Sequence, residues 1–493
     1  MFESAELGQR VEEAAFQKEV PALREALLQA QVELVRRAKF QVVILIAGMD
    51  GAGRGELVNV LNEWMDPRHI ATYGMGDPSA GDDERPPTWR FWSVLPPKGK
   101  IGLFLGSWYT WPLLDRVWGR IKRGDLAEHM QANARFEKML VDEGALVLKF
   151  WMHLSRRQQK ARLESLTRDP RTRWRVSKRD WEHHERHDKL CKAAKLTLTL
   201  TSTAEAPWMI VSGVDRYYRN LTIGKFILDA MRKRLAQKGP GRSAATALTS
   251  ALPTLDNLHI LKSLDLARKV RGKAFKPALE KYQGRLNLLT RQAKFKDLSV
   301  VAVFEGNDAA GKGGAIRRVT AALDARFYQV IPIAAPSDEE RARPYLWRFW
   351  RHIPDRGRIA IFDRSWYGRV LVERVEVLCS PYDWMRAYGE INDFEAQLAA
   401  HGLVVVKFWL SIGKAEQLRR FKERESIAFK RFKITGEDWR NREKWDQYES
   451  AVCDMVERTG TGHAPWTLVE SNDKNYARIK ILKTLCRRIE ARL

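Results

Sequence analysis

A glycine-rich segment from Gly306 to Gly314 has the composition of a loop that surrounds a phosphate group. It reads Gly-Asn-Asp-Ala-Ala-Gly-Lys-Gly-Gly and fits the pattern G-x-x-x-x-G-K. Glycines let the backbone N–H groups approach a phosphate, and a helix that begins near Lys312 adds partial positive charge at its N-terminus. The Lys312 ammonium supplies a full charge for a transferring phosphoryl group. The loop residues expected to contact phosphate are Gly306, Asn307, Ala309, Ala310, Gly311, Gly313 and Gly314.

Two carboxylates predict a magnesium site beside this loop. The Ser or Thr that usually follows the lysine and holds magnesium is replaced by Gly313, so another oxygen has to serve, and Asp308 inside the loop is the candidate. Asp363 ends an apolar run, and a carboxylate at the tip of a buried strand fits the Walker B role. We therefore expect Asp308 and Asp363 to bind Mg²⁺, with Mn²⁺ as a substitute, and both to be catalytic together with Lys312.

Two arginines follow the second carboxylate. Arg364 comes directly after Asp363, and Arg369 lies five positions further on. Guanidinium groups beside a metal site can brace the charge of a phosphoryl group. We predict that Arg364 is catalytic and that Arg369 binds phosphate. For Arg369, an ion pair on a helix surface is an equally good interpretation.

Short apolar runs that alternate with helical stretches must position these residues. The pattern predicts a helix over 312–324 and strands at 299–305, 328–333, 358–363, 403–409 and 466–470. Strands that are apolar throughout are typical of a parallel sheet covered by helices on both faces. The fold class is therefore α/β.

The same pattern occurs twice along the chain. Ser107-Trp108-Tyr109 recurs 258 positions later as Ser365-Trp366-Tyr367, and the apolar run that ends at Gly48 recurs in the run that ends at Gly306. Further pairs at this offset include large and rare side chains. The pairs are Trp92 with Trp350, Trp151 with Trp409, Trp181 with Trp439, and Trp208 with Trp466. One offset held over so long a stretch predicts a tandem duplication.

The boundary between the copies is expected in a segment rich in Gly, Pro, Ser and Thr. This segment covers 237–256 and has the composition of a linker. The predicted domains are then 1–236 and 257–493. A chain of 493 residues is also too long for one compact core.

Composition restricts the partners. The net charge of +25 favours a polyanion, namely nucleic acid, anionic lipid or a phosphate polymer, although part of this charge can lie on solvated helix faces. No uninterrupted apolar run is long enough to span a membrane, and the polar N-terminus lacks a secretory pattern. The four cysteines form no CxxC pair, so reduced thiols and a cytoplasmic location are expected.

The second half of the chain resembles the polyphosphate kinase 2 family. The residues that carry the resemblance are the loop from Gly306 to Gly314, the string from Asp363 to Tyr367, and Lys430 to Lys433 with the later pair Asp438-Trp439. The resemblance covers almost all of 259–493 and, more weakly, 1–235. It implies tandem P-loop kinase domains with a thymidylate-kinase-like core and a mobile helical lid.

The resemblance also implies an activity. Members of the family transfer phosphate between inorganic polyphosphate and nucleotides with the help of magnesium. A two-domain chain with the segment 367–376 is similar to the class that phosphorylates AMP to ADP. In the basic stretch 414–442, where local ion pairs are also expected, the residues predicted to contact polyphosphate are Arg420, Arg424, Lys430 and Lys433.

The first half has lost residues that this chemistry needs. At the offset of 258, Asp308 corresponds to Asp50, but Lys312 corresponds to Arg54 and Asp363 to Leu105. Arg364 and Arg424 correspond to Gly106 and Leu166. A leucine cannot bind a metal ion, so we expect a catalytically inactive first domain with a structural, assembly or polymer-binding role. A residual anion site at Gly48–Gly55 is the alternative.

The expected function is therefore Mg²⁺-dependent transfer of a phosphoryl group from polyphosphate to AMP. Polyphosphate, AMP and ADP are the expected partners, and a homo-oligomer is compatible with the sequence. The alternatives are a polyphosphate:ADP or GDP phosphotransferase, an ATP-dependent nucleotide kinase, and a basic nucleic-acid-binding P-loop ATPase. Nucleic acid is disfavoured because no nucleic-acid-binding module is recognisable. Residues that could shape the acceptor site are Glu340, Arg341, Trp347 and Arg348.

Overall fold

The computed structural model of the protein describes residues 1–79, 81–237, 260–428, 431 and 434–493. The chain divides into two compact units. Of the described residues, the first unit contains 1–77, 90–237 and 337–347, whereas the second contains 78–89 and the remaining residues. Nearly all of the predicted linker 237–256 lies outside the described residues, so the proposed domain boundaries stay predictions.

The N-terminal half of the chain contains five strands among its helices. The strands are β1 (Val42–Gly48), β2 (Ile70–Gly74), β3 (Ile101–Leu105), β4 (Leu146–His153) and β5 (Trp208–Ser212). The helices are α1 (Glu13–Arg37), α2 (Arg54–Trp64), α3 (Trp89–Trp92), α4 (Thr110–Val117), α5 (Arg123–Asp142), α6 (Arg156–Arg168), α7 (Lys178–Glu185), α8 (His187–Thr201) and α9 (Arg216–Ala236).

The C-terminal half repeats this order. Its strands are β6 (Val300–Gly306), β7 (Tyr328–Pro332), β8 (Ile359–Asp363), β9 (Val404–Ser411) and β10 (Trp466–Glu470). Its helices are α10 (Gly272–Thr290), α11 (Lys312–Thr320), α12 (Asp338–Arg341), α13 (Trp347–Trp350), the 3-10 helix η7 (Trp366–Val370), α14 (Val372–Val375), α15 (Pro381–Ala400), α16 (Lys414–Ser426), α17 (Gly436–Glu443), α18 (Trp445–Thr459) and α19 (Lys474–Glu490).

Each half builds one five-stranded sheet with the same topology. The strand orders are β2-β3-β1-β4-β5 and β7-β8-β6-β9-β10, and all neighbouring strands are parallel. The central strands β1 and β6 are almost entirely buried, which matches their unbroken apolar sequence. The carboxyl ends of parallel strands meet at one edge, so the loops after β6, β8, β9 and β10 converge there.

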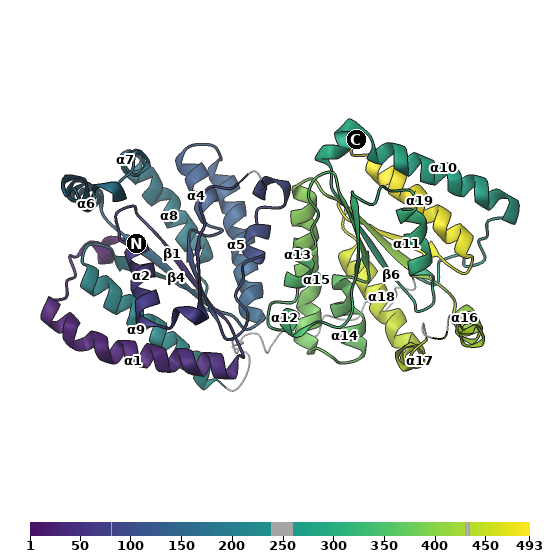
Figure 1. Cartoon of the computed structure of the whole chain (residues 1–493), viewed down its shortest axis with the longest axis horizontal. Helices are drawn as coiled ribbons and strands as arrows, with labels where there is room; N and C mark the ends of the chain where they lie inside the picture. The colour runs from purple at the N-terminus through teal and green to yellow at the C-terminus, as the bar shows by residue number, and fades with distance from the viewer. Residues whose placement is uncertain (80, 238–259, 429–430, 432–433) are drawn as a thin grey trace. The chain divides into compact units, whose positions relative to one another are not determined.

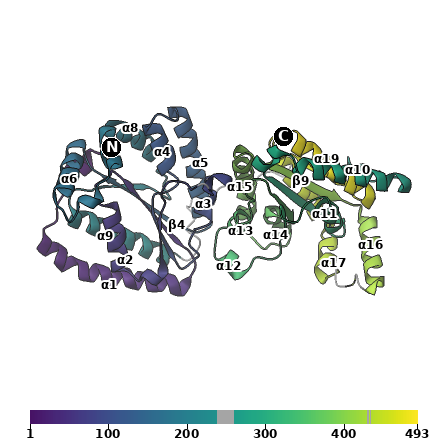
Figure 2. The same cartoon turned by 45° about the horizontal axis from the view of Figure 1, so that its top comes forward.

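Helices cover both faces of each sheet, as Figures 1 and 2 show for each unit. In the first unit α1 packs against α9, and α5 packs against α8. In the second unit α10 packs against α19, and α15 packs against α18. The predicted α/β class with a doubly covered parallel sheet is therefore confirmed.

The predicted strands of the second half all exist, with ends shifted by at most two residues. The predicted helix 312–324 is shorter, because α11 ends at Thr320. Beyond that point the backbone N–H of Ala322 bonds to the Val319 carbonyl and that of Leu323 to the Thr320 carbonyl. These tighter i to i−3 bonds end the α-helix, a tertiary detail that periodicity does not reveal.

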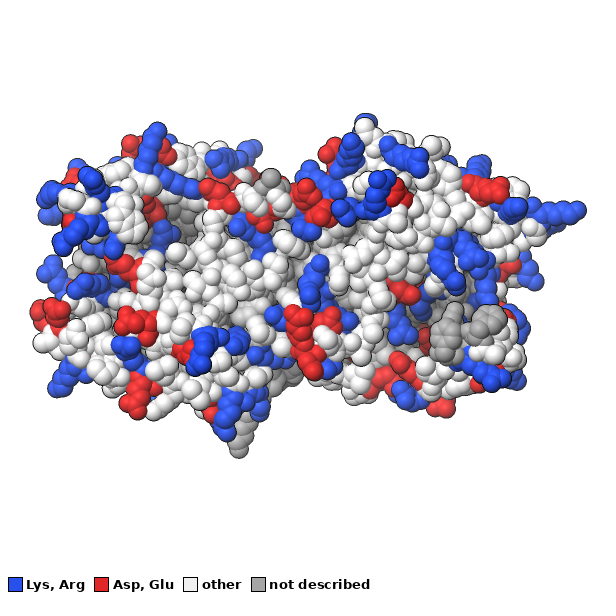
Figure 3. Space-filling view, viewed as in Figure 1, with Lys and Arg blue, Asp and Glu red and all other residues white. Residues whose placement is uncertain are grey.

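Charged side chains are interspersed on the surface. On the visible face of each unit, Asp and Glu lie among the Lys and Arg side chains (Figure 3). Many of the 86 Lys and Arg side chains thus have acidic neighbours, and the net charge of +25 is the excess that remains. None of the described helices is both long and apolar enough to cross a membrane.

A buried ion pair joins the sheet to the segment that follows β8. Lys407 on β9 and Glu395 on α15 are both fully buried, with their charged atoms 2.7 Å apart. The Trp366 indole donates to one carboxylate oxygen of Glu395 at 3.0 Å, and the Tyr367 hydroxyl donates to the same oxygen at 2.6 Å. Lys407 also donates to Tyr367 at 2.8 Å and to the Thr459 carbonyl at 2.7 Å. Every charged group of this network therefore has partners.

The first unit contains the corresponding ion pair, although its Tyr109 hydroxyl makes no hydrogen bond to a described residue as that of Tyr367 does. Lys149 lies 2.6 Å from Glu137 and donates to the Thr201 carbonyl at 2.6 Å. The Trp108 indole donates to Glu137 at 3.0 Å. All these positions correspond at the offset of 258, so the duplication preserved this buried pair even where the loop residues changed.

Removing one partner of the pair should destabilise the unit that contains it. We expect Lys407→Met to lower the free energy of unfolding of the second unit by about 3 kcal/mol or more, because it leaves the Glu395 carboxylate buried without a counter-charge. Urea unfolding followed by circular dichroism measures this loss. The double variant Lys407→Met/Glu395→Leu should be more stable than Lys407→Met. A double variant less stable than the single variant would contradict this account.

Candidate active site

The loop between β6 and α11 is shaped by contacts with β9. Gly306 has φ 151°, and a Cβ at this position would lie 2.4 Å from the Leu410 carbonyl oxygen, so only glycine fits. The N–H of Asn307 donates to the same carbonyl at 3.1 Å, and its side-chain oxygen accepts from the N–H of Ile412 at 3.1 Å. The side chain of Asn307, predicted to contact phosphate, therefore holds the loop on the sheet.

Lys312 folds back over this loop. Its Nζ donates to the Gly306 carbonyl at 2.7 Å and lies 3.5 Å from the Asn307 carbonyl. The ammonium thus lies at the mouth of the loop, at the N-terminus of α11. This is the position from which a lysine can meet a phosphate oxygen, as predicted.

Asp308 is connected to the helices that follow β9. One oxygen of its carboxylate accepts from the Asn441 amide on α17 at 2.8 Å, and its backbone carbonyl accepts from Gln417 on α16 at 3.2 Å. The Tyr448 hydroxyl donates to the Asn441 side-chain oxygen at 3.0 Å. Burial raises the pKa of Tyr448, so this phenol stays protonated and continues to donate. The orientation of Asp308 is therefore set by three helices.

Arg364 has an unusual backbone conformation. Its φ is 65°, in the left-handed region that non-glycine residues rarely adopt, whereas the corresponding Gly106 has φ 86°. The same turn thus follows β3 and β8, but the second copy holds an arginine in it. Strain of this kind concentrates at functional sites, where the surrounding structure maintains it.

Several carboxylates surround this arginine. Arg364 lies 3.7 Å from Asp308, and half of its side chain is exposed. Burial opposes its charge, but the nearby acids Asp308, Glu305, Glu437 and Asp363 raise the pKa of Arg364 above its ordinary value. The guanidinium therefore stays charged in the middle of an acidic group.

Glu305 and Asp363 are neighbours at the edge of the sheet. Burial raises the pKa of Glu305, while Lys312 and a hydrogen bond from Ser365 at 2.8 Å act against this effect. Asp363 ends β8 opposite Phe304 of β6 and contributes electrostatically to both Glu305 and Arg364. The predicted metal ligands Asp308 and Asp363 thus both act electrostatically on Arg364, and of the two only Asp308 lines the described cavity.

A small cavity of about 90 Å³ lies above the loop. Its walls include Glu305, Gly306, Asn307, Asp308, Lys312, Arg364, Trp409, Gln417, Glu437, Asn441, Trp445 and Tyr448. Within the described ranges, three or more His, Cys, Asp or Glu side chains nowhere form a ready-made metal cluster. Two carboxylates are nevertheless enough for Mg²⁺, which completes its octahedron with water and substrate phosphates.

The prediction that Arg420 contacts polyphosphate does not agree with its position. This side chain is only 2% exposed. It donates to the carbonyls of Ala309 and Ala310 at 2.9 and 3.1 Å, and to those of Ser471 and Asn472 at 2.6 and 2.9 Å. Arg420 therefore positions the loop by joining it to the start of α19. Sequence alone could not separate this buried arginine from its exposed neighbours on α16.

The other predicted cationic contacts have different outcomes. Arg369 pairs with Glu373 at 2.8 Å, which is the ion pair considered as the alternative. Arg424 lies in the last turn of α16 and is partly exposed. Lys430 and Lys433 lie outside the described residues, so their contacts with polyphosphate stay predictions.

None of the side chains suggested for the acceptor site lines the described cavity. Glu340 and Arg341 lie in α12, and Trp347 is buried. Arg348 donates to the Ala334 carbonyl at 3.0 Å. These residues therefore have structural contacts of their own.

Sequence analysis missed several residues of this site. Glu305 has a recognisable signal, because it is an acidic residue inside an otherwise apolar strand. Asn441 and Tyr448 have none, because only the folded chain brings α17 and α18 to the loop.

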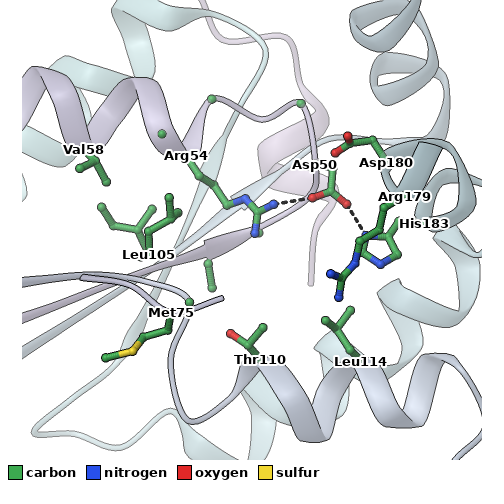
Figure 4. A pocket seen from close by; sticks show the side chains of 18 of the residues that line it. Asp50, Arg54, Val58, Met75, Leu105, Thr110, Leu114, Arg179, Asp180 and His183 are labelled. Carbon is green, nitrogen blue, oxygen red and sulfur yellow. Dashed lines mark hydrogen bonds and ion pairs between the residues drawn. The ribbon is translucent and has the colours of Figure 1, made fainter. Parts of the chain in front are cut away.

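The corresponding site in the first unit has a different arrangement. Asp50 forms an ion pair with Arg54, and its other oxygen lies 2.7 Å from His183 Nδ1 (Figure 4). Burial opposes the charge of Asp50, but Arg54 and His183 hold its pKa below the ordinary value. Leu105 occupies the place of the second carboxylate. The expected loss of the metal ligand pair from the first half agrees with this geometry.

Comparison with known proteins identifies the family. The sequence profile described as Polyphosphate kinase 2 matches residues 10–239 and again 269–493. A polyphosphate:AMP phosphotransferase of Pseudomonas aeruginosa is 55% identical over 491 residues, which cover 100% of this chain and 99% of that protein. One of Acinetobacter johnsonii is 38% identical, with 91% of each chain covered.

A solved structure agrees. The crystal structure of a protein described as a polyphosphate kinase 2 from Pseudomonas aeruginosa PA01 matches with a TM-score of 0.91 at 53% identity. The match covers 100% of this chain and 99% of that one. This chain therefore belongs to the polyphosphate kinase 2 family, with one copy of the family domain in each half.

Proposed function

We propose that this chain transfers the terminal phosphoryl group of inorganic polyphosphate to AMP and so produces ADP. The observation that carries the proposal is the cluster of Lys312, Asp308 and Asp363 at one edge of the second sheet, in a chain that matches a polyphosphate:AMP phosphotransferase over its full length. Phosphoryl transfer needs such a cluster, because its catalysis consists mainly of positioning and charge neutralisation.

The reaction is an in-line displacement. An oxygen of the AMP phosphate forms a new bond to the terminal phosphorus of polyphosphate, while the bridging P–O bond to the next phosphate breaks. The electron pair of that bond leaves with the shortened polyphosphate. The AMP oxygen is already anionic, so no general base is needed. Lys312 and Arg364 neutralise the charge that gathers on the transferring group and the leaving oxygen.

Asp308 and Asp363 would hold the magnesium ion. Both carry carboxylate oxygens, which this cation prefers as ligands. The acidic residues around Arg364 also carry an excess of negative charge, which a divalent cation would neutralise. When bound, Mg²⁺ supplies charge neutralisation to the phosphate oxygens. The hydrogen bond from Asn441 turns one oxygen of Asp308 toward α17, and the other oxygen, which faces Arg364 at 3.7 Å, is the one that would bind the metal.

A comparison of donors and acceptors tests the function. The purified full chain is incubated with long-chain polyphosphate and Mg²⁺ and is offered AMP, ADP, GMP and GDP in parallel, with ATP as the alternative donor. We expect ADP from AMP at the highest rate, and EDTA should abolish the transfer. Exclusive use of ADP or GDP, or of ATP as donor, would overturn the proposal.

The phosphate-binding lysine provides a matched pair of variants. Lys312→Ala should lower kcat/KM with AMP by about 100-fold or more, because it removes charge from the transferring group. Arg54→Ala, the corresponding change in the first half, should leave kcat/KM within about threefold, since that loop lacks the second carboxylate. Equal losses in both variants would assign catalysis to both halves and contradict the proposal.

Arg364 offers a test that separates activity from stability. Arg364→Gly should lower kcat/KM by about 100-fold, because the guanidinium is lost. The same change should leave the free energy of unfolding unchanged or raise it by about 1 kcal/mol, because glycine adopts the left-handed conformation without strain. Initial rates and urea unfolding of one preparation measure both. Loss of activity together with loss of stability would show a structural role instead.

A cytoplasmic location and a homo-oligomeric state stay predictions from the sequence. Binding of Mn²⁺ in place of Mg²⁺ is likewise a proposal, and the assay above tests it when Mn²⁺ replaces Mg²⁺.

A further inference from the structure

The first unit contains a large cavity above its own glycine-rich loop. Its volume is about 880 Å³, compared with about 90 Å³ at the site in the second unit. The glycine loop after β1 and the start of α2 form one end (Figure 4). A cavity of this size accommodates a small-molecule ligand.

The acidic residues of the second site have been replaced here. Of the four carboxylates around Arg364, only Asp308 has an acidic counterpart, Asp50. The corresponding pairs at the offset of 258 are Glu305 with Ala47, Asp363 with Leu105, and Glu437 with Arg179. The positions that would hold a metal ion are thus apolar or cationic here. The cavity also has the carboxylates Glu56, Asp77 and Asp180 in its walls. Each of them is bonded to the protein: Glu56 to Arg162, Arg175 and Arg219, Asp77 to Arg179, and Asp180 to Ser177. A phosphate group therefore needs no metal ion to neutralise these walls.

The remaining carboxylate is already neutralised by the protein. Asp50 pairs with Arg54 on one oxygen and with His183 on the other. His183 replaces Asn441, so a neutral amide has become an imidazole. In the first unit Arg54 and His183 neutralise the carboxylate of Asp50, as a metal ion would neutralise that of Asp308 in the second unit.

His183 has a second nitrogen without a partner. The side chain is 9% exposed and lines the cavity, and Nε2 is buried and makes no hydrogen bond to any described residue. A buried polar nitrogen without a partner is costly. Arg54 and Arg179 point into the same cavity from opposite sides (Figure 4). A phosphate oxygen placed between these groups would accept a hydrogen bond from Nε2 when the ring carries a proton on both nitrogens, and so supply the missing partner.

Apolar and aromatic side chains line much of the rest of the cavity, beside polar ones such as Asn59, Thr110 and Thr197. The apolar and aromatic ones are Ile46, Met75, Leu105, Tyr109, Trp111, Leu113, Leu114, Trp151, Leu166, Trp174 and Trp208. Trp174 is 74% exposed and stands at the rim, beside Arg175. The apolar surfaces of these side chains cannot form hydrogen bonds or ion pairs with inorganic polyphosphate, which is polar throughout, but they can pack against a flat aromatic ring.

We propose that the cavity of the first unit binds a nucleoside 5′-phosphate without a metal ion. The phosphate lies at the loop after β1, near Arg54, Arg179 and His183, and the base lies against the aromatic walls. Arg179 can turn to the phosphate because its ion pair with Asp77 is 3.1 Å long and half exposed, and such a pair contributes little. The site has no catalytic role, because its second metal carboxylate is Leu105.

Calorimetric titration of the full chain in EDTA tests this site. AMP should bind, and adenosine and inorganic phosphate should each bind about tenfold more weakly, because each uses only one end of the cavity. Medium-length inorganic polyphosphate should compete with AMP no better than inorganic phosphate does. Absence of AMP binding in EDTA, or displacement of AMP by polyphosphate at lower concentrations than by inorganic phosphate, would overturn the proposal. Phosphotransferase activity plays no part in this readout, so its result is independent of the proposed reaction.

Variants at the two ends of the cavity assign the binding. Arg179→Glu, which introduces the residue type found at 437, should weaken AMP binding about tenfold, whereas Arg179→Lys should change it by less than about threefold. Leu114→Trp should weaken AMP but not phosphate, because it fills the apolar end. Lys312→Ala in the other half should leave the binding in EDTA unchanged. Loss of binding in Lys312→Ala, or retention in Arg179→Glu with an unchanged melting temperature, would place the ligand elsewhere.

Discussion

The geometry of the second site depends on the buried pair of Lys407 and Glu395. Burial by itself would raise the pKa of Glu395 and lower that of Lys407, so each charge persists only because of the other and of its hydrogen bonds. Through Trp366 and Tyr367 the pair fixes the backbone that follows β8. That backbone carries Asp363 and the strained Arg364, so the residues proposed for catalysis follow a segment that is bonded to a buried ion pair.

The residues with the most distinctive chemistry were predicted from sequence, and those defined by packing were not. The place of Lys312 and Asp308 in a loop between a strand and a helix was predicted, because glycine spacing and strand context identify such a loop, and their catalytic roles stay predictions. The position of Asp363 followed from an apolar run that ends in a carboxylate. Arg420 was misassigned, because an arginine that binds carbonyls and one that binds phosphate look alike in sequence. Asn441 reaches Asp308 only through tertiary structure.

The fold shows the same division. Mainly apolar runs predicted the strands within two residues, because burial on both faces tolerates a charged residue such as Lys407 only where it has partners. The shorter α11 was missed, since its last turn tightens through local i to i−3 bonds rather than through any change in composition. The repeat at an offset of 258 positions adds information that periodicity lacks, because it pairs each residue of one site with its counterpart in the other from the sequence alone.

Comparison of the two halves separates what holds the fold from what performs the chemistry. The ion pair of Lys149 and Glu137 is kept, although the carboxylate after β3 has become Leu105. Had the first half persisted only as a scaffold, its loop would be free to lose every charged group. Instead Asp50 is retained and balanced by Arg54 and His183. The substitutions remove carboxylates that would need a metal ion and keep Asp50 with its protein partners. This pattern is expected of a site that has lost its catalytic activity and still binds the phosphate group of a ligand.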